Sequence, residues 1–313
     1  MITVDRYCPA LSGEWDHAVG NSRNGTFMHL RPYMDYHADR FDDFSLIARD
    51  TRGSIVAVLP AERTGGTLRS HGGLTYGGWL MSDHADMNTM TEVWNTALEF
   101  LADNGISELI YKPVPHIYHR YPAEEDLYCL FRTNAVADAV QVSSAIDLNA
   151  PVGFDTNSRR NLRRALKTGL TVSRSTDYAS FMQILTQVLA ERHGTQPVHS
   201  LAEIELLASR FPDNIALYGV FDSDRMVAGT IIYLTHTVAH AQYIASGTEG
   251  RANGALALLF SYLTKLYAGH VRYFDFGISC EEGGRVLNTG LVRQKNGFGA
   301  RAVTYNSFRL SWQ

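Results

Sequence analysis

The sequence predicts an α/β protein with two domains, each a mixed and mostly antiparallel sheet flanked by helices. Three observations support this prediction. The chain has 313 residues, which is long for one domain and sufficient for two of about 150 residues each. Short strand-like runs joined by polar turns alternate with amphipathic helical stretches in both halves. Asn149-Ala150-Pro151 interrupts this pattern, so we expect domains at residues 1–150 and 151–313.

The first half predicts a hairpin and one long helix around a glycine-rich segment. Apolar residues from Met90 to Leu101 recur at helical spacing, and the pattern ends at Asn104-Gly105. Four glycines lie within residues 70–78, a density typical of irregular turns or of backbone close to a ligand. The elements expected in this half are a helix at 26–37, strands at 44–49 and 54–60, the helix ending at 101, and a strand at 107–112.

The second half repeats this alternation in a different order. Ser200-Leu201-Ala202-Glu203 is a capping box, so a helix begins there and stops before Pro212. Residues 222–225 form a polar turn between two strands. The other expected elements are helices at 155–167, 176–193 and 254–268, and strands at 215–221, 226–234, 238–246 and 272–276.

Two helices, three antiparallel strands, a glycine-led helix and a further strand form an order that resembles the core of GNAT acyltransferases. In that core acyl-CoA binds after the third strand, where residues 246–255 lie here. Arg251 and Gly254 match the pyrophosphate motif R/Q-x-x-G-x-G/A, whereas its last position is Leu256. A loop of this kind directs backbone N–H groups at a pyrophosphate; an ordinary helix cap is the alternative. The resemblance implies an acyl-CoA site formed by Tyr243, Ala245, Ser246, Arg251, Asn253 and Gly254. Gly254→Val is then expected to weaken CoA binding and leave the fold intact.

The C-terminal sequence resembles the FemAB-like branch of the GNAT superfamily. Residues 273–277 read YFDFG, and Leu291 and RQKNGFG at 293–299 follow. The resemblance extends over the chain, so both domains are expected to be GNAT-like. The segments SHGGLTYGG, PAEEDLY, AHAQYIASG and FDFGIS are similar to FemAB-like proteins of surface-polysaccharide synthesis, including nucleotide-sugar N-acyltransferases.

Three residues are candidate catalytic groups. Asp275 ends an apolar strand, where burial can raise a carboxyl pKa toward that of a base; a structural capping role is the alternative. His71 can titrate near neutrality, as can His193 and His199, and the alternative is chance placement of one among twelve histidines. Lys295 can face the donor carbonyl or a phosphate, or be solvated. An oxyanion contact is expected from backbone N–H groups of residues 243–246.

Aromatic and cationic residues are candidates for binding the acceptor. The loop between Pro113 and Pro122 carries several that could stack a base near a phosphate, or simply form a structural loop. In the helix at 155–167, Arg160, Arg163, Arg164 and Lys167 form one basic stripe, either a solvated face or a phosphate-binding wall. The substrate-binding candidates are Tyr76, His116, Tyr118, Arg120 and His199.

The function that these resemblances imply is transfer of an acyl group, such as a 3-hydroxyacyl group, from acyl-CoA to the amine of a nucleotide-linked amino sugar. A dTDP-3-amino-3,6-dideoxyhexose for O-antigen or capsule is the example we expect. One alternative is aminoacyl-tRNA-dependent peptidyl transfer, which is disfavoured because no sustained heptad pattern predicts a coiled-coil arm. The other alternative is a non-catalytic binding protein that retains the fold.

Composition limits the partners and the location. A net charge of -4 and a pI near 6.3 provide no general attraction to DNA or tRNA. The three cysteines share no metal-like spacing, so we expect no metal and a reducing cytoplasm. Residues 1–17 lack a signal-like apolar region, and no stretch is long enough to span a membrane.

Overall fold

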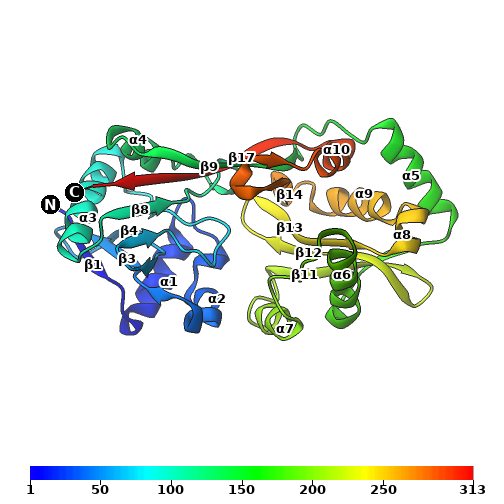
Figure 1. Cartoon of the computed structure of the whole chain (residues 1–313), viewed down its shortest axis with the longest axis horizontal. Coiled ribbons are helices and arrows are strands. Elements are labelled where there is room, and N and C mark those ends of the chain that lie inside the picture. Colours follow the sequence, from blue (N-terminus) through cyan, green and yellow to red (C-terminus); the bar gives the residue numbers. More distant parts are fainter. Residues whose placement is uncertain (313) are drawn as a thin grey trace. The chain divides into compact units, whose positions relative to one another are not determined.

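The structure is a computed structural model that describes residues 1–312, apart from the side chains of Arg192 and His193. It contains two compact units. The first comprises Met1–Gln141, Glu282–Val286 and Thr304–Gln313, and the second comprises Val142–Glu281 and Leu287–Val303. Each unit is a mixed, mostly antiparallel sheet with helices, as predicted (Figure 1). The single boundary after residue 150 stays a prediction.

The first unit contains two groups of strands, ordered β1-β3-β4-β7 and β17-β8-β6-β5-β2. The strand β17 (Arg301–Ser311) enters this unit from the second one. The remaining elements are β1 (Thr3–Arg6), α1 (Ser12–Asn21), α2 (Arg31–Met34), β2 (Asp42–Asp43), β3 (Leu46–Arg49), β4 (Ile55–Leu59), β5 (Glu62–Thr64), β6 (Thr67–Arg69), β7 (Leu80–Met81), α3 (Met87–Asp103), β8 (Glu108–Tyr111) and α4 (Glu125–Arg132).

The long predicted helix of the first unit is α3. Asp86 caps its start, because the Asp86 carboxylate accepts a hydrogen bond from the Thr89 N–H. Its apolar face is buried against Leu46 and Ala48 of β3 in one core. Asn104-Gly105 ends the helix, and Gly105 takes a positive φ of 73° that glycine adopts without strain.

The second unit has strands in the order β10-β11-β12-β13-β14-β9. The strand β9 (Val136–Asp147) begins in the first unit and ends in this one. The remaining elements are α5 (Thr156–Lys167), β10 (Thr171–Ser175), α6 (Tyr178–His193), α7 (Leu201–Arg210), β11 (Ile215–Asp222), β12 (Arg225–Leu234), β13 (Val238–Ser246), α8 (Thr248–Asn253), α9 (Ala255–Tyr267), β14 (Tyr273–Ile278), β15 (Cys280–Glu281), β16 (Val286–Leu287) and α10 (Thr289–Gly297).

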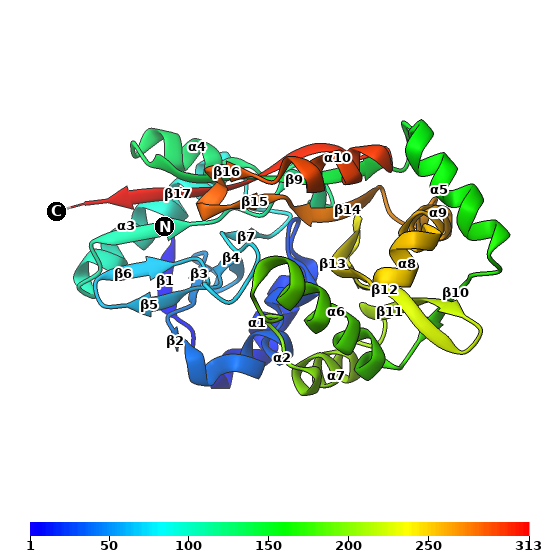
Figure 2. The ribbon, with the colours of Figure 1, turned by 45° about the vertical axis from the view of Figure 1, so that its right-hand side comes forward.

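In the second unit, α9 and α6 cover opposite faces of the sheet. Ala228 on β12 belongs to the same apolar core as Phe260 of α9. A Cβ on the next residue, Gly229, would lie 2.8 Å from the Phe181 ring of α6. Because successive strand residues point to opposite faces, the two helices lie on different sides (Figure 2). Such a sheet is buried on both faces.

Two predictions about local structure are wrong. Residues 26–37 do not form one helix: they contain two short 3-10 segments and the four-residue α2, with extended backbone at Leu30. Pro32 lies in the first turn of α2 and lacks the N–H that a continuous helix would need there. The expected phosphate loop at 246–255 is also different, because residues 248–253 are helical and form α8.

Candidate functional site

An opening in the sheet of the second unit is created by two strands that pair only over part of their length. β13 and β14 run parallel from the Val238–Tyr273 pair to the His240–Asp275 pair. Beyond this point β13 continues to Ser246, while β14 continues in antiparallel pairing with β9. The edge of β13 that faced β14 therefore has no ladder partner from β14 over its second half.

A β-bulge lies at the start of this unpaired edge. Ile231 on β12 pairs with Tyr243, and Ile232 pairs with Ala241, so Gln242 is the extra residue on β13. A bulge interrupts the regular ladder and changes the direction of the backbone groups beside it. The bulge and the divergence of the strands together place β13 backbone amides where they can bind a ligand rather than a strand.

A cavity of about 300 Å³, here called the strand-gap cavity, lies at this divergence. Its lining includes residues of α6 and of α9, which cover opposite faces, so the cavity passes between the two faces of the sheet. The residues are Leu185, Val188, Leu189, Ala241, Gln242, Ile244, Ala245, Ser246, Arg251, Leu256, Phe260, Phe276, Ile278, Leu291, Gln294, Lys295 and Phe298.

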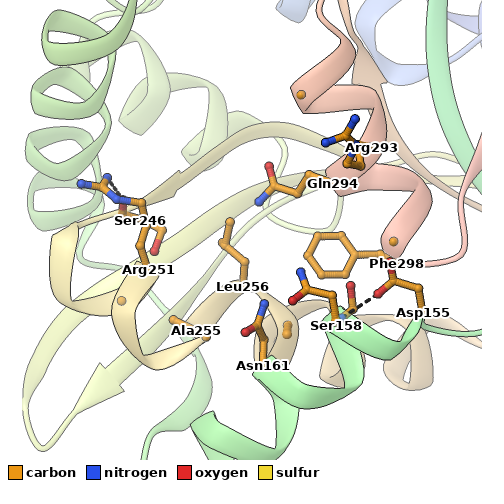
Figure 3. A pocket seen from close by; sticks show the side chains of 16 residues that line it. Asp155, Ser158, Asn161, Ser246, Arg251, Ala255, Leu256, Arg293, Gln294 and Phe298 are labelled. Atoms are coloured by element: carbon orange, nitrogen blue, oxygen red, sulfur yellow. Dashed lines mark hydrogen bonds between the residues drawn. The ribbon is translucent and has the colours of Figure 1, made fainter.

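A second cavity of about 530 Å³, the helix-start cavity, adjoins the first (Figure 3). The first turns of α9 and α5 and one side of α10 form its walls. Residues Ser246, Arg251, Leu256, Gln294 and Phe298 line both cavities. The others are Asp155, Asn157, Ser158, Asn161, Gly250, Gly254, Ala255, Ala257, Gly290, Arg293 and Gly297.

The helix-start cavity combines features that suit an anion. The first backbone N–H groups of α9 lie at the positive end of its dipole, although the Ala257 N–H donates to the Gly254 carbonyl oxygen at 3.0 Å. Arg251 and the exposed Arg293 add two cations. Asp155 lies here too, but its carboxylate accepts from the Ser158 N–H, which lowers its pKa and occupies it as the α5 cap (Figure 3). This cavity therefore fits a phosphate group.

The predicted cofactor residues are distributed unevenly around these cavities. Arg251, Ser246 and Gly254 line the helix-start cavity, and Ala245 lines the strand-gap cavity. The Arg251 guanidinium donates to the Ser246 carbonyl oxygen at 2.7 Å, so it is held at the junction of the two (Figure 3). Tyr243 and Asn253 are not among the residues that line either one.

Gly254 is required by packing, which overturns one expectation from the sequence. Its φ is 78°, and a Cβ there would lie 2.4 Å from the Asn161 carbonyl oxygen of α5. A valine would therefore clash with backbone atoms and would not leave the fold intact. Gly250 has a similar role, because a Cβ would lie 2.5 Å from the Val227 oxygen. Gly254, which matches the pyrophosphate motif, thus permits close packing against α5, and Gly250 permits close packing against β12.

Asp275 is fully buried at the point where β13 and β14 diverge. Its Oδ1 accepts hydrogen bonds from Ser143 Oγ at 2.6 Å and from the Gly277 N–H at 3.1 Å. Its Oδ2 lies 2.8 Å from Nδ1 of His240, on the neighbouring strand. Asp275 does not line either cavity. This geometry supports a positioning role, and its proposed role as a base stays a prediction.

His240 is a residue that our sequence reasoning did not select. It is largely buried, and its strand position directly opposite Asp275 brings the imidazole and the carboxylate together. The signal lay in the segment AHAQYIASG, whose histidine is in the last residue pair between β13 and β14, directly opposite the aspartate of FDFG. Only the strand register makes that pairing evident.

Lys295 is buried on α10 beside the end of β14. Its ammonium donates to the carbonyl oxygens of Gly277 and Ile278, at 2.8 and 2.9 Å, and to Ser279 Oγ at 2.8 Å. These three bonds use all the N–H groups of an ammonium. Burial lowers the pKa of Lys295 to about 8, against the opposing effect of Asp275. The lysine thus stabilises the backbone at the end of β14, beside the strand-gap cavity.

His71 lies in the first unit, within an aromatic cluster. Its ring stacks on His37 at 5.5 Å and contacts Phe41, and its Nδ1 accepts from the Gly73 N–H at 3.2 Å. Burial lowers the pKa of His71 to about 3. An imidazole with this pKa is neutral at pH 7 and is a weak base.

The buried neutral His71 predicts acid sensitivity. Between pH 6.5 and about 3 the unfolded chain binds a proton at this residue and the folded chain does not, so stability falls as pH decreases through that range. At pH 5 the contribution of His71 to this loss is ~2 kcal/mol. His71→Asn, which suits the positive φ of 58°, should reduce the stability difference between pH 7 and 5 by that amount.

Urea unfolding at the two pH values measures this effect. His116→Asn, an exposed histidine of the same unit, is the matched control for loss of an imidazole. If the difference in unfolding free energy between pH 7 and pH 5 is the same in His71→Asn as in the wild type, His71 is already protonated at pH 5 in the folded protein.

The predicted substrate residues lie in both units. Tyr76 and Tyr118 are buried in the first unit, and the Tyr118 hydroxyl lies 2.8 Å from that of Tyr305. His116 and Arg120 are exposed, and Arg120 donates to the Gly20 carbonyl oxygen. In the second unit, His199 Nδ1 lies 2.6 Å from the Tyr243 hydroxyl. The structure thus joins two candidates that the sequence assigned to different ligands. The side chain of His193 lies outside the described residues.

The basic stripe of α5 borders the helix-start cavity. Asn157 and Asn161 of α5 line that cavity, and Arg160 and Arg164 lie next to them on the helix surface. Both arginines are exposed, and Arg164 donates to the Ala252 carbonyl oxygen of α8. A phosphate contact by this stripe stays a prediction.

The described residues provide neither a group of metal ligands nor a membrane-spanning helix. Among the side chains that the structure describes, no three of His, Cys, Asp or Glu are grouped so that they could hold a metal ion. None of the described helices combines the length and the apolar character needed to cross a membrane.

Comparisons with known proteins address the fold. Residues 154–283 match the acetyltransferase (GNAT) domain family. No curated protein matches the chain in sequence. Among solved structures, the chain is similar to FemX, with 13% identity and a TM-score of 0.69, over 99% of this chain and 97% of that one. It is also similar to L-PGS from Bacillus licheniformis, with 11% identity and a TM-score of 0.59, over 97% and 91%.

A third similar structure is a tandem GNAT protein from the clavulanic acid biosynthesis pathway. It has 11% identity and a TM-score of 0.50, over 99% of this chain and 98% of that one. At these identities the likenesses concern the fold. They confirm the prediction of two GNAT-like domains in tandem and support the resemblance to the FemAB-like branch.

Proposed function

We propose that this FemAB-like GNAT protein is an acyl-CoA-dependent N-acyltransferase. The observation that carries the proposal is the strand-gap cavity, because it passes through the sheet where β13 and β14 diverge. A slot of this kind accepts an extended arm and excludes water from its reactive end. Residues 154–283, which match the GNAT domain family, include all residues that line the strand-gap cavity except those between 291 and 298.

In this proposal the two cavities bind different parts of acyl-CoA. The pyrophosphate occupies the helix-start cavity, near the first amides of α9 and the cations Arg251 and Arg293. The pantetheine arm enters the strand-gap cavity through the residues shared by both. The thioester carbonyl then lies near the bulge at Gln242, where a β13 N–H donates to the oxygen as it becomes negative.

The acceptor that we propose is the amine of a nucleotide-linked amino sugar, such as a dTDP-3-amino-3,6-dideoxyhexose, used for O-antigen or capsule. The support is the likeness of four sequence segments to proteins of surface-polysaccharide synthesis. We also propose that the protein acts in the cytoplasm. The neutral amine attacks the thioester carbon, the C–N bond forms, the C–S bond breaks, and the amine proton leaves as the thiolate is protonated. A base is needed only if the amine arrives protonated.

Thiol release tests this function directly. With an acyl-CoA, a dTDP-amino sugar and no RNA, we expect free CoA to appear at a rate that depends on both substrates, measured with a thiol-reactive dye. The rate should fall only slightly between low and moderate salt, because a few phosphate contacts are involved rather than a whole tRNA. Protein without the amino sugar is the control for hydrolysis.

Two outcomes would contradict the proposal. Product that forms only with charged tRNA, or that RNase abolishes, would favour aminoacyl-tRNA-dependent peptidyl transfer. Tight binding of the nucleotide sugar without turnover of any donor would favour a non-catalytic binding protein.

A further inference from the structure

We propose that the donor acyl group is uncharged, apolar and larger than acetyl. This inference rests on the proposed function and specifies the donor for the same site. It follows from the side chains at the end of the strand-gap cavity that is remote from the helix-start cavity.

The direction of the donor in the cavity follows from which residues the two cavities share. The shared residues, such as Ser246 and Arg251, mark the phosphate end. Ala245 precedes Ser246 on β13, and Ala241 and the bulged Gln242 lie farther back along the strand. The cavity passes through the sheet to the face opposite α9, where its lining comes from α6. The acyl group, which is the last part of the donor, therefore lies against α6.

The α6 end of the cavity is apolar. Leu185, Val188 and Leu189 lie at helical spacing on one side of α6 and all face the cavity, and Ile278 of β14 adds a fourth aliphatic side chain. Leu185 is buried, while Val188 and Leu189 are half-buried. An acyl chain that covers them removes more apolar surface from water, which favours binding.

The same end offers no partner for a charged acyl group. None of the described residues lining the cavity is an aspartate or a glutamate, so the ammonium of an aminoacyl group would lack a counter-ion. The cavity has two cations, but the three N–H groups of Lys295 bind protein oxygens and Arg251 is held at the phosphate end. A carboxylate in the acyl group would be equally unpaired. Burial of an unpaired charge is strongly unfavourable.

A panel of donors measures this preference. We compare kcat/KM for acetyl-, butyryl-, succinyl- and glycyl-CoA with one amino-sugar acceptor. Two extra buried methylenes should give butyryl-CoA an advantage of roughly tenfold over acetyl-CoA. We expect succinyl- and glycyl-CoA, which carry an ionised group, to react at least about a hundredfold more slowly than butyryl-CoA.

A variant that fills the α6 end localises the effect. Leu189→Trp should cancel or reverse the preference for butyryl- over acetyl-CoA, because the indole occupies the space of the longer chain. The matched control is Ala190→Trp, which adds the same side chain at an exposed neighbouring position outside the cavity. Ala190→Trp should keep the wild-type preference.

Calorimetry with CoA itself separates this proposal from the proposed function. CoA has no acyl group, so its affinity should be the same in the wild type and in Leu189→Trp. A preference for acetyl, succinyl or glycyl donors in a protein that binds CoA would overturn the acyl inference alone. Absence of CoA binding and of thiol release with every donor would overturn the proposed function as well.

Discussion

Asp275→Asn is expected to fold and to lose about 10²-fold in turnover, while CoA affinity changes little. The amide keeps the shape of the buried carboxylate and can still accept from Ser143 and the Gly277 N–H. Its NH₂ group, however, would face Nδ1 of His240 in place of an acceptor oxygen. The imidazole must then change its tautomer or its orientation at the point where β13 and β14 diverge.

The measurement compares kcat and KM for the donor with CoA binding by calorimetry. Ser143→Ala is the matched control, because it removes one hydrogen bond to Asp275 and keeps the His240 contact. We expect a smaller loss of turnover in Ser143→Ala than in Asp275→Asn. Near-normal turnover in a folded Asp275→Asn protein would show that the pair has no part in the reaction.

Gly254→Ala is expected to lower the free energy of unfolding of the second unit by about 3 to 5 kcal/mol. Two costs combine. The positive φ of 78° is unfavourable for a residue with a side chain, and the added Cβ would lie 2.4 Å from the Asn161 oxygen, which is backbone and cannot rotate away. The helices α5 and α9 would have to separate.

Gly269→Ala is the control that isolates the overlap. Gly269 lies in the same unit with a similar φ of 81°, but a Cβ there would meet nothing within 4 Å. Gly269→Ala should lower the free energy of unfolding only by the cost of the positive φ, about 1 to 2 kcal/mol. Urea unfolding of the two variants gives both values. Equal losses of unfolding free energy in Gly254→Ala and Gly269→Ala would mean that α5 moves away from α9 without cost.

Much of the fold was predictable because the elements carry local signals. The apolar spacing in α3 and the capping box of α7 at Ser200 each depend on neighbours within a few residues. The helix expected at 26–37 does not form as one element, because Pro32 lacks the N–H that a continuous helix needs there. The helix α10 was not among the predicted elements, and it contains Gly290 and Gly297, which are poor helix formers.

The candidate site was predictable only in part. The likeness of its motifs identified Arg251, Gly254, Asp275 and Lys295 as important positions, but it did not distinguish their roles. Lys295 uses its N–H groups on the protein itself, and Gly254 is needed for packing. His240 was missed because its significance depends on a residue 35 positions away in the chain.

The sequence by itself determined the two-domain α/β class and the order of the elements around the site. Both follow from hydrophobic period, caps and turns, which act over short distances along the chain. Only the tertiary structure decided where β13 leaves β14, which residue is bulged, and that the gap opens onto α6. Strand register and helix packing join residues distant in sequence, so the energies that select them depend on contacts that no local pattern contains.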